Sequence, residues 1–284
     1  MPVDQKHCRV VFRKLSRELA KITKHTGPEA VHKFRTGTRR VETVIEELVP
    51  DPDRSTRKLL KTLHRLRKKA GKVRDLDVQI ASLRNLKITR DGLQKSQLLR
   101  TLAAERARKE NKLFAVLDKD SIRGLRKRLK RSCDTLEIAE GMEPLVLALR
   151  TLSEVVSDRS PLTQKLVHRY RIAGKRARYL IEIAEEDKES EATIEKLKKL
   201  QDIVGEWHDW LTLTQRAEDA FGGVKQSALV AALRNLTRAK FRESVDAIVQ
   251  IRPILSGERI GLRPAPAASR KPSAASKTPS AVAA

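Results

Sequence analysis

Apolar residues recur at helical spacing along almost the whole chain, and no stretch shows the strict alternation typical of a half-buried strand. Glycine and proline divide this pattern. Helices are therefore expected at residues 4–26, 28–49, 53–86, 91–131, 143–157, 161–187, 190–220 and 223–253. The segment 91–139 stays open, because "LDKDSIRGLRKRLKRS" can either continue a helix or restart one. The pattern predicts an all-α protein.

Two phrases of the chain recur in the same order. "VHKFRTGTRRVETVIEEL" begins at residue 31, and "VHRYRIAGKRARYLIEIA", which begins at residue 167, matches it at six of eighteen positions. Likewise "LHRLRKKAGKVRDLDV", from residue 63, aligns with "LKKLQDIVGEWHDWLT", from residue 197. Two motifs at nearly one offset predict an internal duplication with four helices per copy. Short connections favour antiparallel neighbours, so we expect two four-helix bundles related by pseudo-two-fold symmetry.

The domain boundaries follow from this duplication. The first bundle is expected at residues 1–140 and the second at 141–256. Residues 257–284 include "RPAPAASRKPSAASKTPSAVAA", a Pro/Ala/Ser/Lys tail that cannot bury a core and is expected to be disordered.

Charge narrows the choice of partner. The formal net charge is +25 and the sequence pI is near 10.4. A body this basic attracts polyanions, such as nucleic acid, an anionic membrane or a phosphate polymer. No stretch approaches the roughly 20 apolar residues that span a bilayer, and the N-terminus has no signal pattern. Cys8 and Cys133 form no CxxC pair, so a reducing compartment is the simplest setting. We expect a soluble, cytoplasmic protein without a membrane partner.

The repeated helices each carry a strip of cations. At 100° per residue these side chains share one face that borders the apolar stripe. The strips are His32, Arg35 and Arg39 in the first copy, and His168, Arg171, Lys175 and Arg178 in the second. Side-by-side cations repel one another, and arginine suits phosphate because its planar fork binds two oxygens. Arg40 and Arg176 point away from the strips, and surface ion pairs are an equal alternative for them.

The "WHDW" segment raises an enzymatic alternative. His208 and Asp209 are residue types that ligate metal in phosphohydrolases, and His168 would complete such a site. The other copy argues against this, because Arg74 occupies the position of His208 and a guanidinium does not ligate metal. A basic residue before Asp75 and Asp209 fits anion binding better, with the carboxylates orienting neighbouring cations. No catalytic residue, metal or cofactor is therefore predicted.

These motifs resemble the CHAD domain, the conserved histidine α-helical domain. "VHKFRTGTRR" and "VHRYRIAGKRARYLIE" resemble its histidine motifs, and "AGKVRDLDV" and "LQDIVGEWHD" resemble its Gly-x-x-Arg-Asp-like motifs. The resemblance implies two bundles around a central basic pore or groove that binds inorganic polyphosphate. The implied binding residues are His32, Arg35, Arg39, Arg40, Arg74, His168, Arg171, Lys175, Arg176, Arg178 and His208.

The resemblance further implies localisation to polyphosphate granules, with other granule proteins as additional partners. The chain carries no Glu-rich triphosphate tunnel domain, so a stand-alone, non-enzymatic binding module is expected. Two alternatives remain. The first is binding to the nucleic-acid backbone, although few aromatics are present for base stacking. The second is a metal-dependent polyphosphate phosphohydrolase.

Overall fold

The computed structural model describes residues 3–24, 26–88, 92–139, 141, 143–184 and 188–255, and these ranges form nine α-helices and no sheet. Val3 and Ala184 make one isolated bridge. The all-α prediction is confirmed. The helices are α1 (Gln5–Ile22), α2 (Pro28–Leu48), α3 (Arg54–Asn85), α4 (Gly92–Phe114), α5 (Lys119–Asp134), α6 (Pro144–Val156), α7 (Gln164–Ile181), α8 (Lys188–Phe221) and α9 (Ala228–Leu255).

One predicted helix was wrong. The segment expected as a single helix at 91–131 is divided into α4 and α5, so the restart left open by the sequence is the one observed. Asp118 explains the restart, because its carboxylate accepts a hydrogen bond of 2.8 Å from the backbone N–H of Ser121 and so caps α5. The predicted tail at 257–284 lies outside the described residues.

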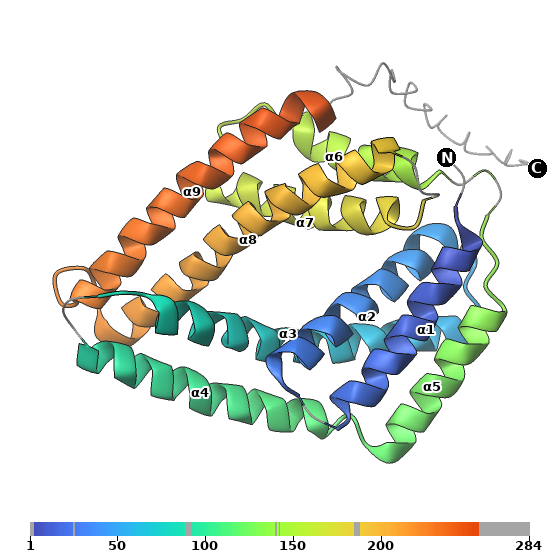
Figure 1. The fold of residues 1–284 in the computed structure, drawn as a ribbon, viewed down its shortest axis with the longest axis horizontal. Helices are drawn as coiled ribbons and strands as arrows, with labels where there is room; N and C mark the ends of the chain where they lie inside the picture. The colour runs from blue at the N-terminus through green and yellow to red at the C-terminus, as the bar shows by residue number, and fades with distance from the viewer. Residues whose placement is uncertain are drawn as a thin grey trace, which may run out of the picture.

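The helices of the two halves follow the same order (Figure 1). In the first half, here residues 3–139, α1 packs on α2, α2 on α3 and α3 on α4. In the second half, residues 143–255, consecutive helices from α6 to α9 pack on one another in the same way. Helix α5 is additional and packs on α1 and α3. Helices at the same place in each half also meet, α2 with α7 and α3 with α8. This order is what a duplication would produce, and the duplication itself stays a prediction.

Buried residues of the two halves form shared clusters. The larger cluster includes Phe12 and Phe34 from the first half and Tyr170 and Trp207 from the second. The smaller cluster joins the end of α3 and the start of α4 to the end of α8 and the start of α9, and its members include Leu76, Leu98, Leu213 and Leu229. Burial of apolar surface therefore holds the halves against each other. The proposed division near residue 140 stays a prediction.

No helix within the described ranges combines the length and the low charge that crossing a membrane requires.

Candidate anion-binding site

Helices α2 and α7 position the two predicted cation strips. Phe34 of α2 and Tyr170 of α7 are fully buried. The apolar stripes to which they belong fix which face of each helix turns inward. The neighbouring cations consequently lie at the border of the core. His32 is exposed, and Arg35 and Arg171 are half-buried. This border position agrees with the prediction that the strips do not point straight into solvent.

Helix α3 comes close enough to α2 for direct contact at a glycine. A Cβ added to Gly71 would stand 3.4 Å from the Nε of Arg35, so this guanidinium lies against the backbone of α3. One turn beyond Asp75 and Asp209, the Nε2 of Gln79 donates a 3.2 Å hydrogen bond to the Oγ1 of Thr212. This bond joins α3 to α8 and brings the two Asp-containing motifs to one place.

Cations of the two halves converge where these four helices meet. Arg35 of α2 lies close enough to α7 to lower the pKa of both Arg171 and Lys175, after the larger effect of burial. Lys175 of α7 likewise acts on α2, because it adds to the effect of burial that lowers the pKa of His32. We call Arg35, Arg171 and Lys175 the central cation cluster. The cluster contains side chains from both halves, as the two-strip prediction requires.

Lys175 shows most clearly how crowded the cluster is. Burial first, and then Arg171 and Arg35, lower the pKa of Lys175 from 10.5 to about 7. Both causes disfavour the charged form of the ammonium group. A bound anion would reverse the second cause, because negative charge favours the protonated form. The site is therefore suited to an anion and is strained electrostatically without one.

The cluster contains a guanidinium with unused hydrogen-bonding capacity. The Nε of Arg171 is buried and has no hydrogen-bond partner among the residues that the structure describes. Within the described ranges no ion pair of 4.0 Å or less joins Arg35, Arg171 or Lys175 to a carboxylate. A buried, unpaired donor of this kind has a free-energy cost that an acceptor from a ligand would relieve.

Three histidines and one arginine border the cluster. Burial, followed by Arg74, lowers the pKa of His32. Burial, followed by His208, lowers the pKa of His168, and the rings of His168 and His208 stack with centroids 5.3 Å apart. His32 and His168 are therefore biased towards the neutral form, and an anion beside them would favour protonation.

The two aspartates lie beside the cluster and offset part of its charge, because burial lowers the pKa of Arg171 while Asp209 and, more weakly, Asp75 raise it. Solvent reaches Asp75 from one side, yet protein surrounds its other sides, so burial raises its pKa and Asp209 adds to the rise. Arg35 and Arg171 act in the opposite direction on the pKa of Asp75. The Oδ1 of Asp209 lies 3.8 Å from the Nδ1 of His208. Their orienting role stays a prediction.

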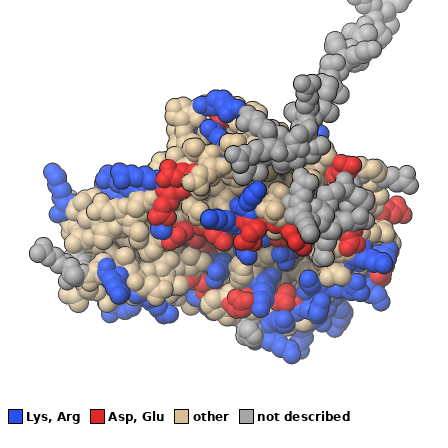
Figure 2. Space-filling view, turned by 45° about the horizontal axis from the view of Figure 1, so that its top comes forward, with Lys and Arg blue, Asp and Glu red and all other residues tan. Residues whose placement is uncertain are grey.

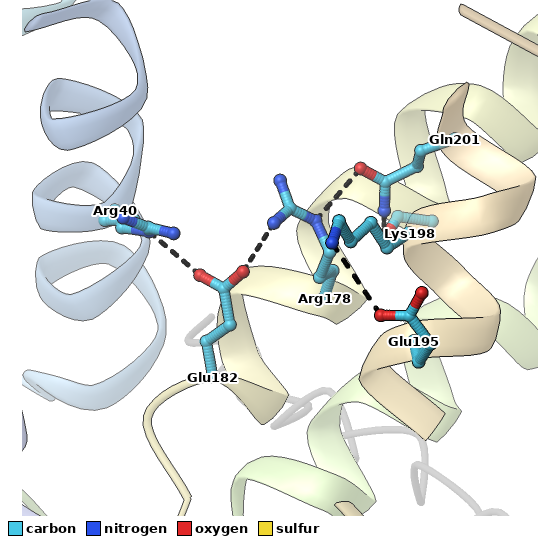
Figure 3. A network of polar contacts seen from close by, with 7 residues as sticks. Arg40, Arg178, Glu182, Glu195, Lys198 and Gln201 are labelled. Carbon is cyan, nitrogen blue, oxygen red and sulfur yellow. Dashed lines mark hydrogen bonds and ion pairs between the residues drawn. The ribbon is translucent and has the colours of Figure 1, made fainter. Parts of the chain in front are cut away.

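Three of the predicted arginines bind carboxylates instead, and Figure 3 shows two of them, Arg40 and Arg178, on either side of Glu182. The Nε of Arg40 donates to Glu182 at 2.8 Å, and the Nη1 of Arg178 donates to the other oxygen of Glu182 at 2.5 Å. Likewise the Nε of Arg176 donates to Glu47 at 2.7 Å. For Arg40 and Arg176 these contacts favour the ion-pair alternative that the sequence left open, and both pairs connect α2 to the C-terminal part of α7 or its cap.

The last predicted cation, Arg39, occupies an intermediate position. Its side chain is 39% exposed, and its Nη1 lies 3.9 Å from Glu42, which Arg67 contacts more closely. Sequence reasoning missed Glu42, Glu47 and Arg67 as members of this surrounding network. The available signal was their position on α2 and α3, which are the helices that carry the motifs.

The enzymatic alternative requires a set of metal ligands. His168, His208 and Asp209 do come near one another, as that alternative requires. In the described part of the chain, however, no group of three His, Cys, Asp or Glu side chains is arranged to hold a metal ion.

Three comparisons place the chain among known proteins. The CHAD domain model matches residues 8–218. The crystal structure of the CHAD domain from the plant Ricinus communis aligns with a TM-score of 0.60 at 18% identity, covering 89% of each chain. PptA from Streptomyces chartreusis aligns with a TM-score of 0.64 at 12% identity, covering 88% of this chain and 97% of the other. Curated protein sequences gave no match. The matched motifs, the all-α fold and the extent of the family match together show that this chain belongs to the CHAD domain family.

Proposed function

We propose that this chain binds inorganic polyphosphate, without catalysing its hydrolysis, at the central cation cluster and the histidines beside it. The observation that carries the proposal is the convergence of Arg35, Arg171 and Lys175 from both halves without a carboxylate ion pair. The family to which the chain belongs is linked to polyphosphate, which supports the same conclusion.

The chemistry of the cluster favours phosphate over a carboxylate or a metal ion. Each guanidinium presents a planar fork that matches two phosphate oxygens, and hydrogen bonds between two charged groups are about twice as strong as neutral ones. Neutralisation by phosphate would also raise the lowered pKa of Lys175 and so add a third cation. A polymer offers such charges at successive positions, which suits a site composed of two facing strips.

The tryptophans near the site are packed against other side chains and are not available to stack on bases, which favours a polymer without bases over a nucleic acid. Readers of single-stranded nucleic acid stack bases on exposed aromatic rings. Here Trp207 is 1% exposed and belongs to the core, and Trp210 packs against the smaller buried cluster. The remaining rings at the site, His168 and His208, stack on each other.

The proposal of binding without hydrolysis rests on a difference between the Asp-containing motifs of α3 and α8. Arg74 in α3 takes the place of His208 in α8, so only one half offers the His-Asp pair that a metal would need. Orthophosphate release that depends on an added divalent metal and is lost in His208→Ala would contradict this part and favour the phosphohydrolase alternative.

The test measures binding of size-defined polyphosphate across a salt series. Arg35→Ala/Arg171→Ala should weaken binding by about 100-fold or more, because two charge-assisted contacts are lost. A matched control, Arg238→Ala/Arg242→Ala, removes two exposed arginines of α9 and leaves both the cluster and the outer face of α3 intact. Equal affinity for wild type and the first variant would contradict the proposal.

Two further outcomes concern the partner. Duplex DNA that displaces polyphosphate at comparable monomer concentration would favour the nucleic-acid alternative. Localisation of the tagged chain to polyphosphate granules in cells, lost in the Arg35→Ala/Arg171→Ala variant, is what the proposed granule association predicts.

A further inference from the structure

We infer that a long polyphosphate chain leaves the central cation cluster in one direction only, along the outer face of α3 and past α5. This inference rests on the proposed function and adds a second binding surface to it. We call this surface the α3 row, and it consists of Lys58, Lys61, Arg65, Lys68 and Lys72.

The α3 row is a continuous line of cations. Its members follow one another at intervals of three and four residues, so they lie on one face of the helix. All five side chains are exposed, and in the part of the chain that the structure describes none of them forms an ion pair. From Lys58 to Lys72 the row spans about 21 Å at 1.5 Å per residue.

The row begins at the site. Lys72 follows Gly71, against which the side chain of Arg35 lies, and it precedes Asp75 by less than one helical turn. Asp75 in turn lies within electrostatic reach of Arg35 and Arg171. A polymer bound at the cluster therefore meets Lys72 as the first member of the α3 row.

Helix α8, which corresponds to α3 in the second half, does not carry a similar row of cations. The positions of α8 that align with the α3 row are Ala192, Glu195, Lys199, Asp202 and Glu206. All five are exposed, and three of them carry negative charge. A phosphate polymer would be attracted to the outer face of α3 and repelled by the corresponding face of α8.

Helix α5 widens the basic surface on the same side. Residues 143–184 and 188–255 contain no counterpart of this helix, and its sixteen residues include seven Lys or Arg and two Asp. A small cavity of about 80 Å³ between α3 and α5 is lined by both Arg65 and Arg128. Arg128 therefore adds to the α3 row near its middle.

The charge of the whole chain is divided in the same way. Residues 1–140 contain 37 Lys and Arg against 18 Asp and Glu, whereas residues 141–256 contain 19 against 17. Figure 2 shows Lys and Arg gathered at the lower right of the molecule, the side on which Figure 1 places α1 and α5, and a band of Asp and Glu across the middle. Almost all of the positive excess of the folded part thus belongs to the first half.

The experiment compares a short and a long ligand. Lys61→Ala/Arg65→Ala/Lys68→Ala should weaken binding of long, size-defined polyphosphate about tenfold and lower its salt slope by about 2, because three phosphate contacts are lost. Binding of tripolyphosphate, which the central cluster accommodates alone, should change by less than about twofold. The matched control is Lys196→Ala/Lys198→Ala/Lys199→Ala, which removes three exposed cations from α8.

The possible outcomes separate this inference from the proposed function. Equal loss of long-chain affinity in the α3 and α8 variants would reduce the effect to net charge and overturn the inference. An equal loss for tripolyphosphate in the α3 variant would also overturn it. If Arg35→Ala/Arg171→Ala has no effect on either ligand, the proposed central site fails, and a polymer that binds the α3 row would then bind it independently of the site.

Discussion

The two halves of the molecule agree at their centre and differ on their outer faces. His32 and His168, and likewise Arg35 and Arg171, occupy corresponding positions on α2 and α7. The positions of α8 that correspond to the α3 row are, in contrast, largely acidic. Any duplicated fold can keep the same residues where its copies meet, because both copies then build one site. Under the proposed function, the halves share one ligand at the centre but contribute unequally to guiding a long one.

The largest expected difference between the halves concerns Lys175 and its counterpart Arg39. Both side chains have a lowered pKa because of burial, but only the lysine can lose its proton near neutral pH. Lys175→Met should raise the free energy of unfolding by about 1–2 kcal/mol at pH 7, because a crowded cation is removed. The same variant should weaken polyphosphate binding about tenfold. Chemical denaturation and a binding assay measure the two effects.

The pH dependence of stability sharpens this comparison. From about pH 7 to 10.5 the unfolded chain keeps a proton on Lys175 that the folded chain has lost. Lys175 therefore makes the free energy of unfolding rise with pH across this window. Lys175→Met should lack that part of the slope, and Arg39→Met should keep it. An unchanged slope in Lys175→Met would contradict the lowered pKa.

A smaller effect is expected from His32 and His168, which occupy corresponding positions in the two halves. The pKa values of His32 and His168 are lowered in the free protein, and bound phosphate would raise them, so binding should take up protons and weaken as pH rises. Calorimetry near pH 7 in buffers of different protonation enthalpy measures this uptake. His32→Gln and His168→Gln should each reduce it. Uptake equal to that of wild type in both variants would assign the histidines a structural role.

The smallest effects are expected from the ion pairs that join α2 to the region of α7. Arg40→Ala should lower the free energy of unfolding by about 1 kcal/mol, and Arg176→Ala by about half as much, because Arg176 is 54% exposed and solvent screens its pair with Glu47. Polyphosphate affinity should stay within about twofold of wild type. A loss comparable with that of Arg35→Ala/Arg171→Ala would return these arginines to the binding site.

Much of the fold was predictable because helical spacing and breakers are local signals. The apolar stripe through Phe34 and Tyr170 predicted helices at the right places, and both side chains are fully buried. The restart at Asp118 was left open, since a capping residue within a basic helical pattern can also be an ordinary helical position. The sharing of buried clusters between the halves depends on long-range packing, which spacing along one helix does not reveal.

The candidate site was predictable where the repeat itself carried the signal. Arg35 and Arg171 share a motif position, and the structure brings them close together. The motif could not separate ligand-facing arginines from paired ones, because the partners Glu182 and Glu47 come from the opposite half. Equally, the approach of Lys175 to Arg35 depends on how α2 and α7 meet, and it adds to the larger effects of burial and of Arg171 that lower the pKa of Lys175.

The most direct measurement is a crystal structure of this chain with size-defined polyphosphate. The account predicts one continuous polymer whose oxygens lie about 2.7–2.9 Å from guanidinium nitrogens of both Arg35 and Arg171, with its long end over α3. A polymer confined to the surface of one half, or bound away from α2 and α7, would contradict it.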